Sequence, residues 1–272
     1  MKKIKTRMKE KYRSAIKKSN NKSLTVYIVL RALVILCLIR ELMLGDFQNA
    51  LLCVLSLILF LLPAFVEKTF KVDLPNTLEI TILVFIFSAE ILGEINNFYG
   101  ILKNFDDILH TLNGFLCASV GFSLVYLLNK NIDSFKLSPL FVSLVAFCFS
   151  MTIGVIWEFF EYGMDTIFSI DMQKDTYVEK INTVELDITK SNKVVNINDI
   201  DHTTLYDEDN NELTTINGYL DIGLIDTMED LIVNFIGALA YSVFGYLYII
   251  NKEKNKIAGK FIIQKKSTTN NV

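Results

Sequence analysis

Three carboxylates stand near the end of a long apolar stretch of the chain, at Glu158, Glu161 and Asp165. Their spacing, i, i+3 and i+7, places them on one face of a helix. Acids at the carboxyl end of a helix face the negative end of its dipole, and the surrounding aromatic residues reduce their solvation. Something must offset both costs, and a bound cation is the first candidate, because carboxylate oxygens are the usual ligands of hard divalent ions.

More acids, and one of the two histidines, occur where other apolar stretches begin or end. If these stretches cross a bilayer alternately, all of the acids fall in one layer at the outer face. The predicted metal ligands are Asp106, Asp107, His110, Glu158, Glu161, Asp165, Asp226 and Asp230, supported by Glu90, Glu94, Asn234 and Arg40. His110 and Glu161 are the candidates for a catalytic role. Such an oxygen-rich set with one imidazole suits Mg²⁺, Mn²⁺, Ca²⁺, Fe²⁺ or Zn²⁺.

Simpler structural roles compete with this interpretation. Asp106, Asp107 and Asp226 stand at helix starts, where capping and the helix dipole favour acids without any metal. Glu94 fits the solvated end of a helix, and Arg40 fits an internal ion pair. The four cysteines all fall inside apolar stretches, so we expect neither a disulfide framework nor a soft-metal thiolate site.

The composition indicates which secondary structure could position these residues. The chain is 51% hydrophobic and has a mean hydropathy of +0.37. Several stretches approach the roughly 20 apolar residues that a membrane-spanning helix needs. We therefore predict an all-α polytopic membrane protein with about six transmembrane helices. The expected spans are 24–44, 47–66, 76–93, 106–128, 140–168 and 227–250.

Basic residues set the expected orientation. Residues 1–23 carry ten Lys or Arg and one acid, and Lys residues recur after the second and fourth spans and in the final tail. Because basic segments next to spans stay in the cytoplasm, both termini are expected there, in a bacterial inner membrane. Nucleic acid is not an expected partner, since no aromatic residues are interleaved with the charges of the first tail. The first apolar stretch should remain as an anchor rather than be cleaved.

The predicted domains follow from this topology. Residues 1–23 form a basic cytoplasmic tail, 24–168 hold helices one to five, 169–225 form an acidic extracytoplasmic insertion, 226–250 form helix six, and 251–272 form a second basic cytoplasmic tail. Alternating polar and apolar residues in the insertion predict short strands and a small β-rich cap between helices five and six. One hairpin is expected where 205–206 and 213–216 flank the polar turn 207–212.

Several of these segments together resemble the YjdF-type family of bacterial inner-membrane proteins. The resemblance extends from the third to the sixth span, over Gly93-Glu94 with Phe98-Tyr99, Asp106-Asp107-Ile108-Leu109-His110, Trp157-Glu158-Phe159-Phe160-Glu161 with Asp165, and Asp226 to Leu231 with Asn234 and Gly237. Its last helix is also distantly similar to that of VanZ-like membrane proteins. A Gln is typical there at the position of Glu161. The YjdF-type resemblance implies no defined activity, whereas the VanZ-like one would imply an envelope role.

Three classes of function are compatible with these residues. The first is a divalent-metal site that activates water or polarises a phosphate on an envelope or lipid-linked substrate. The second is a non-enzymatic membrane scaffold or sensor whose acids hold helices together. The third, an ion-coupled transporter, ranks last, because the inner halves of the last three spans offer almost no ionisable residues and no inverted repeat is apparent.

Overall fold

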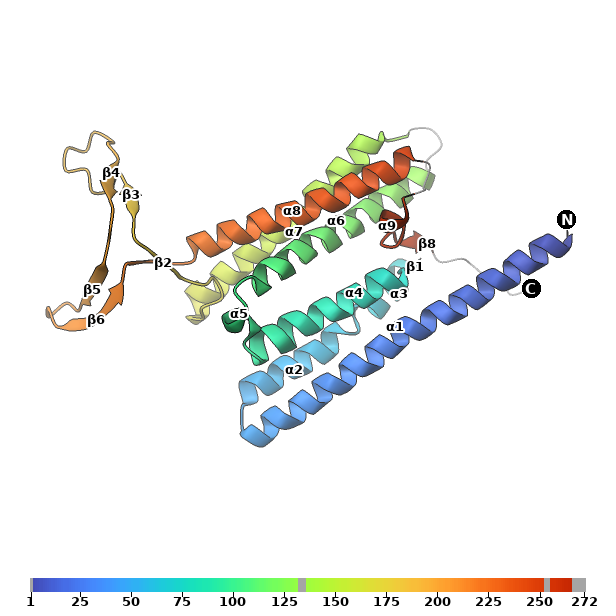
Figure 1. The fold of residues 1–272 in the computed structure, drawn as a ribbon, viewed down its shortest axis with the longest axis horizontal. Coiled ribbons are helices and arrows are strands. Elements are labelled where there is room, and N and C mark those ends of the chain that lie inside the picture. Colours follow the sequence, from blue (N-terminus) through green and yellow to red (C-terminus); the bar gives the residue numbers. More distant parts are fainter. Residues whose placement is uncertain (1, 132–135, 252–254, 266–272) are drawn as a thin grey trace. The chain divides into compact units, whose positions relative to one another are not determined.

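The apolar stretches form long helices, and the polar stretch between the last two of them forms short strands (Figure 1). The structure is a computed structural model that describes residues 2–131, 136–251 and 255–265. It divides into two units, one of Met1–Gly154 with Ile232–Val272 and the other of Val155–Leu231. Parts of the predicted final tail, 252–254 and 266–272, lie outside the described residues.

Ten helical segments occur in the described residues. Their bounds are α1 Lys2–Leu44, α2 Phe47–Leu59, α3 Leu62–Phe70, α4 Asn76–Ile86, the π-helix η1 Phe87–Ile95, α5 Phe98–Ile101, α6 Phe105–Asn131, α7 Pro139–Phe168, α8 Leu224–Ile250 and α9 Lys256–Gly259. Pro63 lies in the first turn of α3, where its missing N–H costs nothing, and this explains why α2 and α3 are separate helices.

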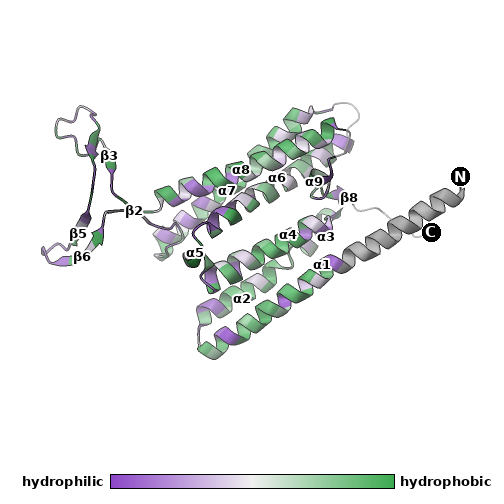
Figure 2. Cartoon of the chain, viewed as in Figure 1, coloured by the Kyte–Doolittle hydropathy of each residue, from purple (hydrophilic) through white to green (hydrophobic). Residues whose placement is uncertain are grey.

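Within the residues that the structure describes, five helical stretches are long and apolar enough to cross a membrane: Lys22–Leu44, Phe47–Phe70, Phe105–Lys130, Pro139–Phe168 and Leu224–Ile250. Figure 2 shows that hydrophobic residues predominate along these helices, whereas hydrophilic and hydrophobic residues are mixed in the strands between α7 and α8. The third predicted span, 76–93, is not among these five stretches and falls on the eleven residues of α4, which continue directly into the nine residues of η1. That stretch carries three glutamates, so the number six stays a prediction.

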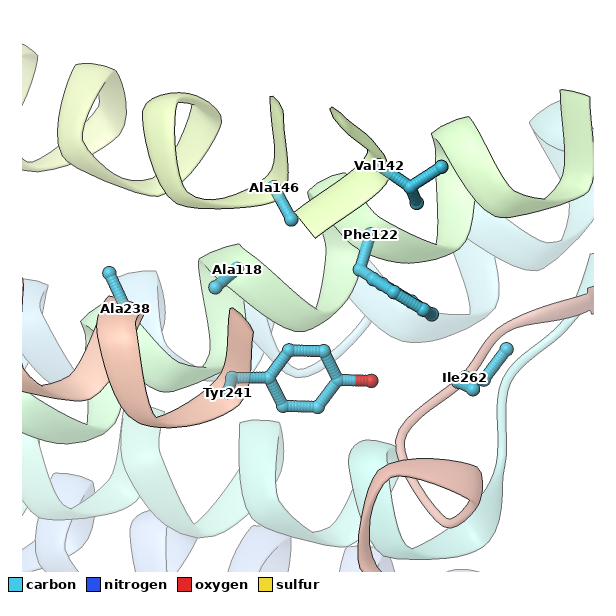
Figure 3. Packing of buried hydrophobic residues seen from close by; sticks show 7 residues of the cluster. All are labelled: Ala118, Phe122, Val142, Ala146, Ala238, Tyr241 and Ile262. Carbon is cyan, nitrogen blue, oxygen red and sulfur yellow. The ribbon is translucent and has the colours of Figure 1, made fainter. Parts of the chain in front are cut away.

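The first unit has a core where α6, α7 and α8 meet. Ala118 and Phe122 of α6 pack with Val142 and Ala146 of α7 and with Tyr241 of α8 (Figure 3). Helices α6 and α8 approach so closely through two glycines that added methyl groups would overlap backbone atoms. A Cβ at Gly114 would meet the carbonyl oxygen of Asn234, and one at Gly237 would meet that of Thr111.

The described part of the C-terminal segment is packed against this core. Ile262 and Ile263 are 3% and 4% exposed, and the backbone N–H of Ile263 donates to Ser123 Oγ of α6 at 2.9 Å. Strand β8 (Gln264–Lys265) pairs antiparallel with β1 (Val72–Asp73). Residues 263–265 therefore link α6 to the connection between α3 and α4.

In the second unit, the chain between α7 and α8 forms three antiparallel two-stranded ladders. Strand β2 (Thr176–Val178) pairs with β7 (Tyr219–Asp221), and β3 (Ile181–Thr183) pairs with β4 (Val195–Ile197). Strand β5 (His202–Tyr206) pairs with β6 (Glu212–Asn217), which confirms the predicted hairpin. The β3–β4 and β5–β6 ladders extend as two arms from the β2–β7 stem (Figure 1).

Candidate functional site

Three of the predicted ligands converge in the second unit. Glu158 and Glu161 lie on successive turns of α7, Asp230 lies on α8, and one carboxylate oxygen of each falls within 4.8 Å of the other two. Their side chains are buried, with 4%, 7% and 3% of each residue exposed. We call these three residues the carboxylate cluster. The spacing of Glu158 and Glu161 was readable in the sequence, whereas the approach of Asp230 depends on how α7 and α8 pack.

Electrostatic repulsion inside the carboxylate cluster is large. Two unit charges 4.8 Å apart repel by about 3.5 kcal/mol at an effective dielectric constant of about 20. Neither α7 nor α8 contains a Lys or Arg that could neutralise the acids from within its own helix. Trp157 Nε1 donates a hydrogen bond to Glu161 Oε1 at 2.8 Å and supplies a neutral donor on the same helix. The arrangement therefore favours uptake of positive charge, as a cation or as protons.

Two other predicted ligands hold the start of the insertion. Asp165 accepts hydrogen bonds from the backbone N–H groups of Met172 at 2.6 Å and Gln173 at 2.8 Å. Asp226 accepts one from the backbone N–H of Lys174 at 2.9 Å. Their carboxylates thus fix the chain where it leaves α7, and we call Asp165 and Asp226 the root acids. The amide of Gln173 reinforces this arrangement through a hydrogen bond of 2.5 Å to Thr227 Oγ1.

Asp106 and His110 form a pair in the first unit. They are four residues apart on α6, and His110 Nε2 lies 3.6 Å from Asp106 Oδ1. The imidazole is only 12% exposed, whereas the carboxylate is 36% exposed. Asp107 follows in the first turn of α6, where the helix dipole stabilises acids. That these residues join the carboxylate cluster in one site stays a prediction.

Asn234 is buried among α6, α7 and α8 in the first unit. It is 1% exposed, its Oδ1 accepts a hydrogen bond from Asn113 Nδ2 at 3.4 Å, and its Nδ2 lies 3.6 Å from Met151 Sδ. A Cβ at Gly154 would come within 2.6 Å of the same Nδ2, so the absence of a side chain at Gly154 makes room for the amide. Asn234 follows Asp230 by one turn of α8, and Gly154 precedes Glu158 by one turn of α7.

The supporting residues Glu90, Glu94 and Arg40 lie elsewhere in the first unit. Both glutamates are on η1, and π-helical turns frequently mark functional sites. Arg40 pairs with the buried Glu41 at 2.5 Å, and its Nη1 donates to Asn96 Oδ1 at 3.3 Å. The described contacts of Arg40 therefore link α1 to the end of η1.

Sequence reasoning missed several partners of these side chains. The hydrogen bond from Trp157 to Glu161 has a readable signal, because residues four apart face each other on a helix. Asp221, whose carboxylate accepts the backbone N–H of Ile225 at 2.9 Å, could have been recognised as an acid just before a helix start. The contact between Asn113 and Asn234 had no local signal, since 121 residues separate the two in sequence.

Comparison with known proteins gives a family but no close relative. The family model DUF2238, described as a predicted membrane protein, matches residues 23–251. No curated protein matches the chain, and no solved structure does. The matched range covers the carboxylate cluster, the root acids and the Asp106–His110 pair.

Proposed function

The chain belongs to the DUF2238 family of predicted membrane proteins, and we propose that its carboxylate cluster binds a divalent cation. One observation carries the proposal: three buried carboxylates from two helices lie with their oxygens within 4.8 Å of one another. Such a set matches the oxygen ligands and the negative charge that Mg²⁺, Mn²⁺ and Ca²⁺ require, and it would also accept Fe²⁺ or Zn²⁺. A cation of charge +2 offsets most of the repulsion among three carboxylates at once.

The proposed topology gives this site access to the outside of the cell. The chain crosses a bacterial inner membrane six times, with the α4–η1 segment as the third span. Both termini are cytoplasmic, and the three β ladders between α7 and α8 are extracytoplasmic. The Lys-rich segments at the termini and after the second and fourth spans support this orientation, because positively charged loops stay in the cytoplasm. The resemblance to YjdF-type inner-membrane proteins agrees with it.

In this arrangement the cation acts on a phosphate-bearing lipid-linked or envelope substrate. A bound divalent ion polarises a phosphoryl oxygen and lowers the pKa of its bound water. The proposal adds Asp106 and His110 from the start of α6, with His110 as a ligand or general acid–base group. Glu161, held by Trp157, would orient the attacking water or coordinate the ion.

A non-enzymatic scaffold or sensor is the second candidate, and the root acids favour it. Asp165 and Asp226, which are also on α7 and α8, accept backbone hydrogen bonds and so serve the architecture of the chain. If the carboxylate cluster has the same role, neutral isosteres should replace its members without loss of function. An enzyme would not tolerate such replacement.

Metal analysis of the purified full-length protein tests the proposal. Wild-type protein in detergent, dialysed against Mg²⁺, Mn²⁺, Ca²⁺, Fe²⁺ or Zn²⁺ in turn, should retain about one equivalent of at least one ion. The double variant Glu158→Gln/Asp230→Asn should retain none. Glu229→Gln, an exposed neighbour of Asp230 on α8, should bind as the wild type does. The proposal of a cation site is refuted if the wild type retains well below one equivalent of every ion. It is also refuted if the double variant retains as much metal as the wild type.

A further inference from the structure

The second unit contains a cavity of about 830 Å³, formed where the stem and the two arms of the β ladders meet. This volume lies within the range of 300–1,000 Å³ that is usual for ligand sites. The lining residues are Tyr177, Glu179, Asp199, Ile200, Asp201, Thr215, Ile216, Asn217 and Gly218. Backbone hydrogen bonds from Ile200 N to Glu179 O at 2.9 Å and from Gly218 N to Asp201 O at 2.8 Å hold its walls together.

The charged side chains that line the cavity are all acidic. Glu179, Asp199 and Asp201 are exposed, and the Asp201 carboxylate lies 3.0 Å from His202 Nδ1. The whole segment 169–223 carries twelve acids and four lysines. This charge favours a cationic ligand, because such a ligand would meet an attractive negative potential during approach and when bound.

The cavity also offers apolar and aromatic contacts. The ring of Tyr177, which is 60% exposed, suits the stem of a Lys or the guanidinium of an Arg. Ile200 and Ile216 supply half-buried apolar surface. The adjoining ladders each consist of two strands in the described residues, so each has an outer edge to which an extended chain can add.

We propose that this cavity binds an extended cationic peptide segment of another protein, with a Lys or Arg side chain among Glu179, Asp199 and Asp201. The peptide backbone lies along the edge of a neighbouring ladder. A second copy of the same insertion does not fit, since it carries the same excess of acids. The site is separate from the carboxylate cluster and does not depend on the cation proposed there.

Peptide binding to the full-length protein tests this assignment. The protein is placed in nanodiscs of uncharged phosphatidylcholine, so that the probe does not bind the lipid. The probe is a fluorescent twelve-residue peptide of alternating Lys and Val, and its Glu–Val counterpart is the charge control. Anisotropy should show saturable binding of the Lys peptide alone. A version methylated on alternate backbone nitrogens should bind at least fivefold more weakly, because it cannot complete a strand ladder.

Two matched triple variants distinguish binding in the cavity from non-specific electrostatic attraction of the peptide to the acidic insertion. The variant Glu179→Gln/Asp199→Asn/Asp201→Asn should weaken binding at least tenfold. Asp199 has a left-handed backbone, with φ 56°, which Asn also adopts readily. The control Glu185→Gln/Glu208→Gln/Asp209→Asn removes the same charge from exposed positions outside the cavity and should change binding less than threefold.

Other outcomes would overturn the proposal. Equal losses in the two triple variants would mean non-specific attraction to an acidic surface. Full displacement of the peptide by micromolar spermidine, or by micromolar Ca²⁺, would assign the cavity to a small cation instead. If the cavity variant fails to fold, Asp199→Asn alone is measured, and unchanged affinity in that variant contradicts the role of the cavity.

Discussion

Replacing Glu161 by Gln should make the protein more stable than the wild type without divalent metal and less stable than the wild type with it. The change keeps the shape of the side chain and an oxygen that can accept the hydrogen bond from Trp157 Nε1. It removes one of three negative charges whose oxygens lie within 4.8 Å of one another, and with it two of the three repulsive pairs. Each pair costs about 3.5 kcal/mol at an effective dielectric constant of about 20.

This repulsion is comparable with the stability of a typical domain. Three pairs amount to about 10 kcal/mol when all three carboxylates are ionised, against typical unfolding free energies of about 5–15 kcal/mol. Without metal at pH 8, the wild type must therefore take up a proton or lose stability. The Glu161→Gln variant keeps only one pair, so relief of even one repulsion should raise its unfolding midpoint by about 7 °C.

Thermal unfolding in detergent at pH 8, with either EDTA or saturating metal, measures which of the two proteins has the higher unfolding midpoint under each condition. Metal at about 10,000 times its dissociation constant should stabilise the wild type by about 5.5 kcal/mol, which exceeds the roughly 3.5 kcal/mol that relief of one repulsion gives the variant. It should stabilise Glu161→Gln much less, because a ligand is missing. The wild type is then the less stable protein in EDTA and the more stable one in metal. Glu229→Gln, which is exposed on α8, should follow the wild type under both conditions.

Two results would refute this reasoning. If metal leaves the wild-type midpoint unchanged while acidification raises it, the carboxylate cluster holds protons and not a cation. If Glu161→Gln and the wild type have equal midpoints in EDTA, the three carboxylates do not repel one another as their spacing requires. The second result would remove the electrostatic reason for a cation at this position.

Three further changes test the architecture. Gly237→Ala should lower the unfolding midpoint, because the added methyl group would overlap the backbone oxygen of Thr111 and overpacking costs about 1–3 kcal/mol. Gly163→Ala, with nothing within 4 Å, is its control and should be neutral or slightly stabilising. Ser123→Ala removes the acceptor of the buried Ile263 N–H, so it should cost about 1–3 kcal/mol and speed C-terminal trimming by carboxypeptidase. As its control, Thr152→Ala changes an exposed hydroxyl and should neither lower the stability nor speed the trimming. Hydrogen bonds from the Thr189 side chain and from the backbone amides of Lys193, Thr189 and Ser191 lower the pKa of Asp187 to about 2. Since the unfolded pKa is about 3.9, the stabilisation of this loop is complete above that pH and is lost as the pH falls through about 2. Amide-exchange protection of Ser191 should follow the same course, and Asp187→Asn should lack this protection already at pH 5.

Much of the helical architecture can be predicted from local sequence. Length and hydropathy predict the long apolar helices, and the alternation around 207–212 predicts the β5–β6 hairpin. The pairing of Glu158 with Glu161 follows from helical periodicity alone. These features depend on residues a few positions apart, so a single sequence contains the information.

Features that depend on distant contacts could not be predicted. The sequence predicts a basic tail after α8 and gives no sign that Ile262 and Ile263 are buried, because the α6 residue that binds Ile263 lies more than a hundred residues earlier. The change from α4 to the π-helix η1 was also not predicted, because the apolar composition of 76–93 indicates only one continuous helical span. Asp165 and Asp226 fit a metal site by position, and only the path of residues 172–174 gives them hydrogen-bond partners.

The root acids connect the carboxylate cluster to the insertion. Asp165 follows Glu161 by one turn of α7, and Asp226 precedes Asp230 by one turn of α8. Helix α7 therefore carries two acids of the carboxylate cluster and α8 carries one, and each helix has, a turn further toward the insertion, one acid that holds the backbone between Met172 and Lys174. A cation that draws Glu161 and Asp230 together must also shift the root acids, because a helix transmits a displacement over one turn almost rigidly. Metal binding should then slow amide exchange at Gln173 and Lys174, and Asp165→Ala should abolish this effect at Gln173 while the stoichiometry of the bound metal stays unchanged.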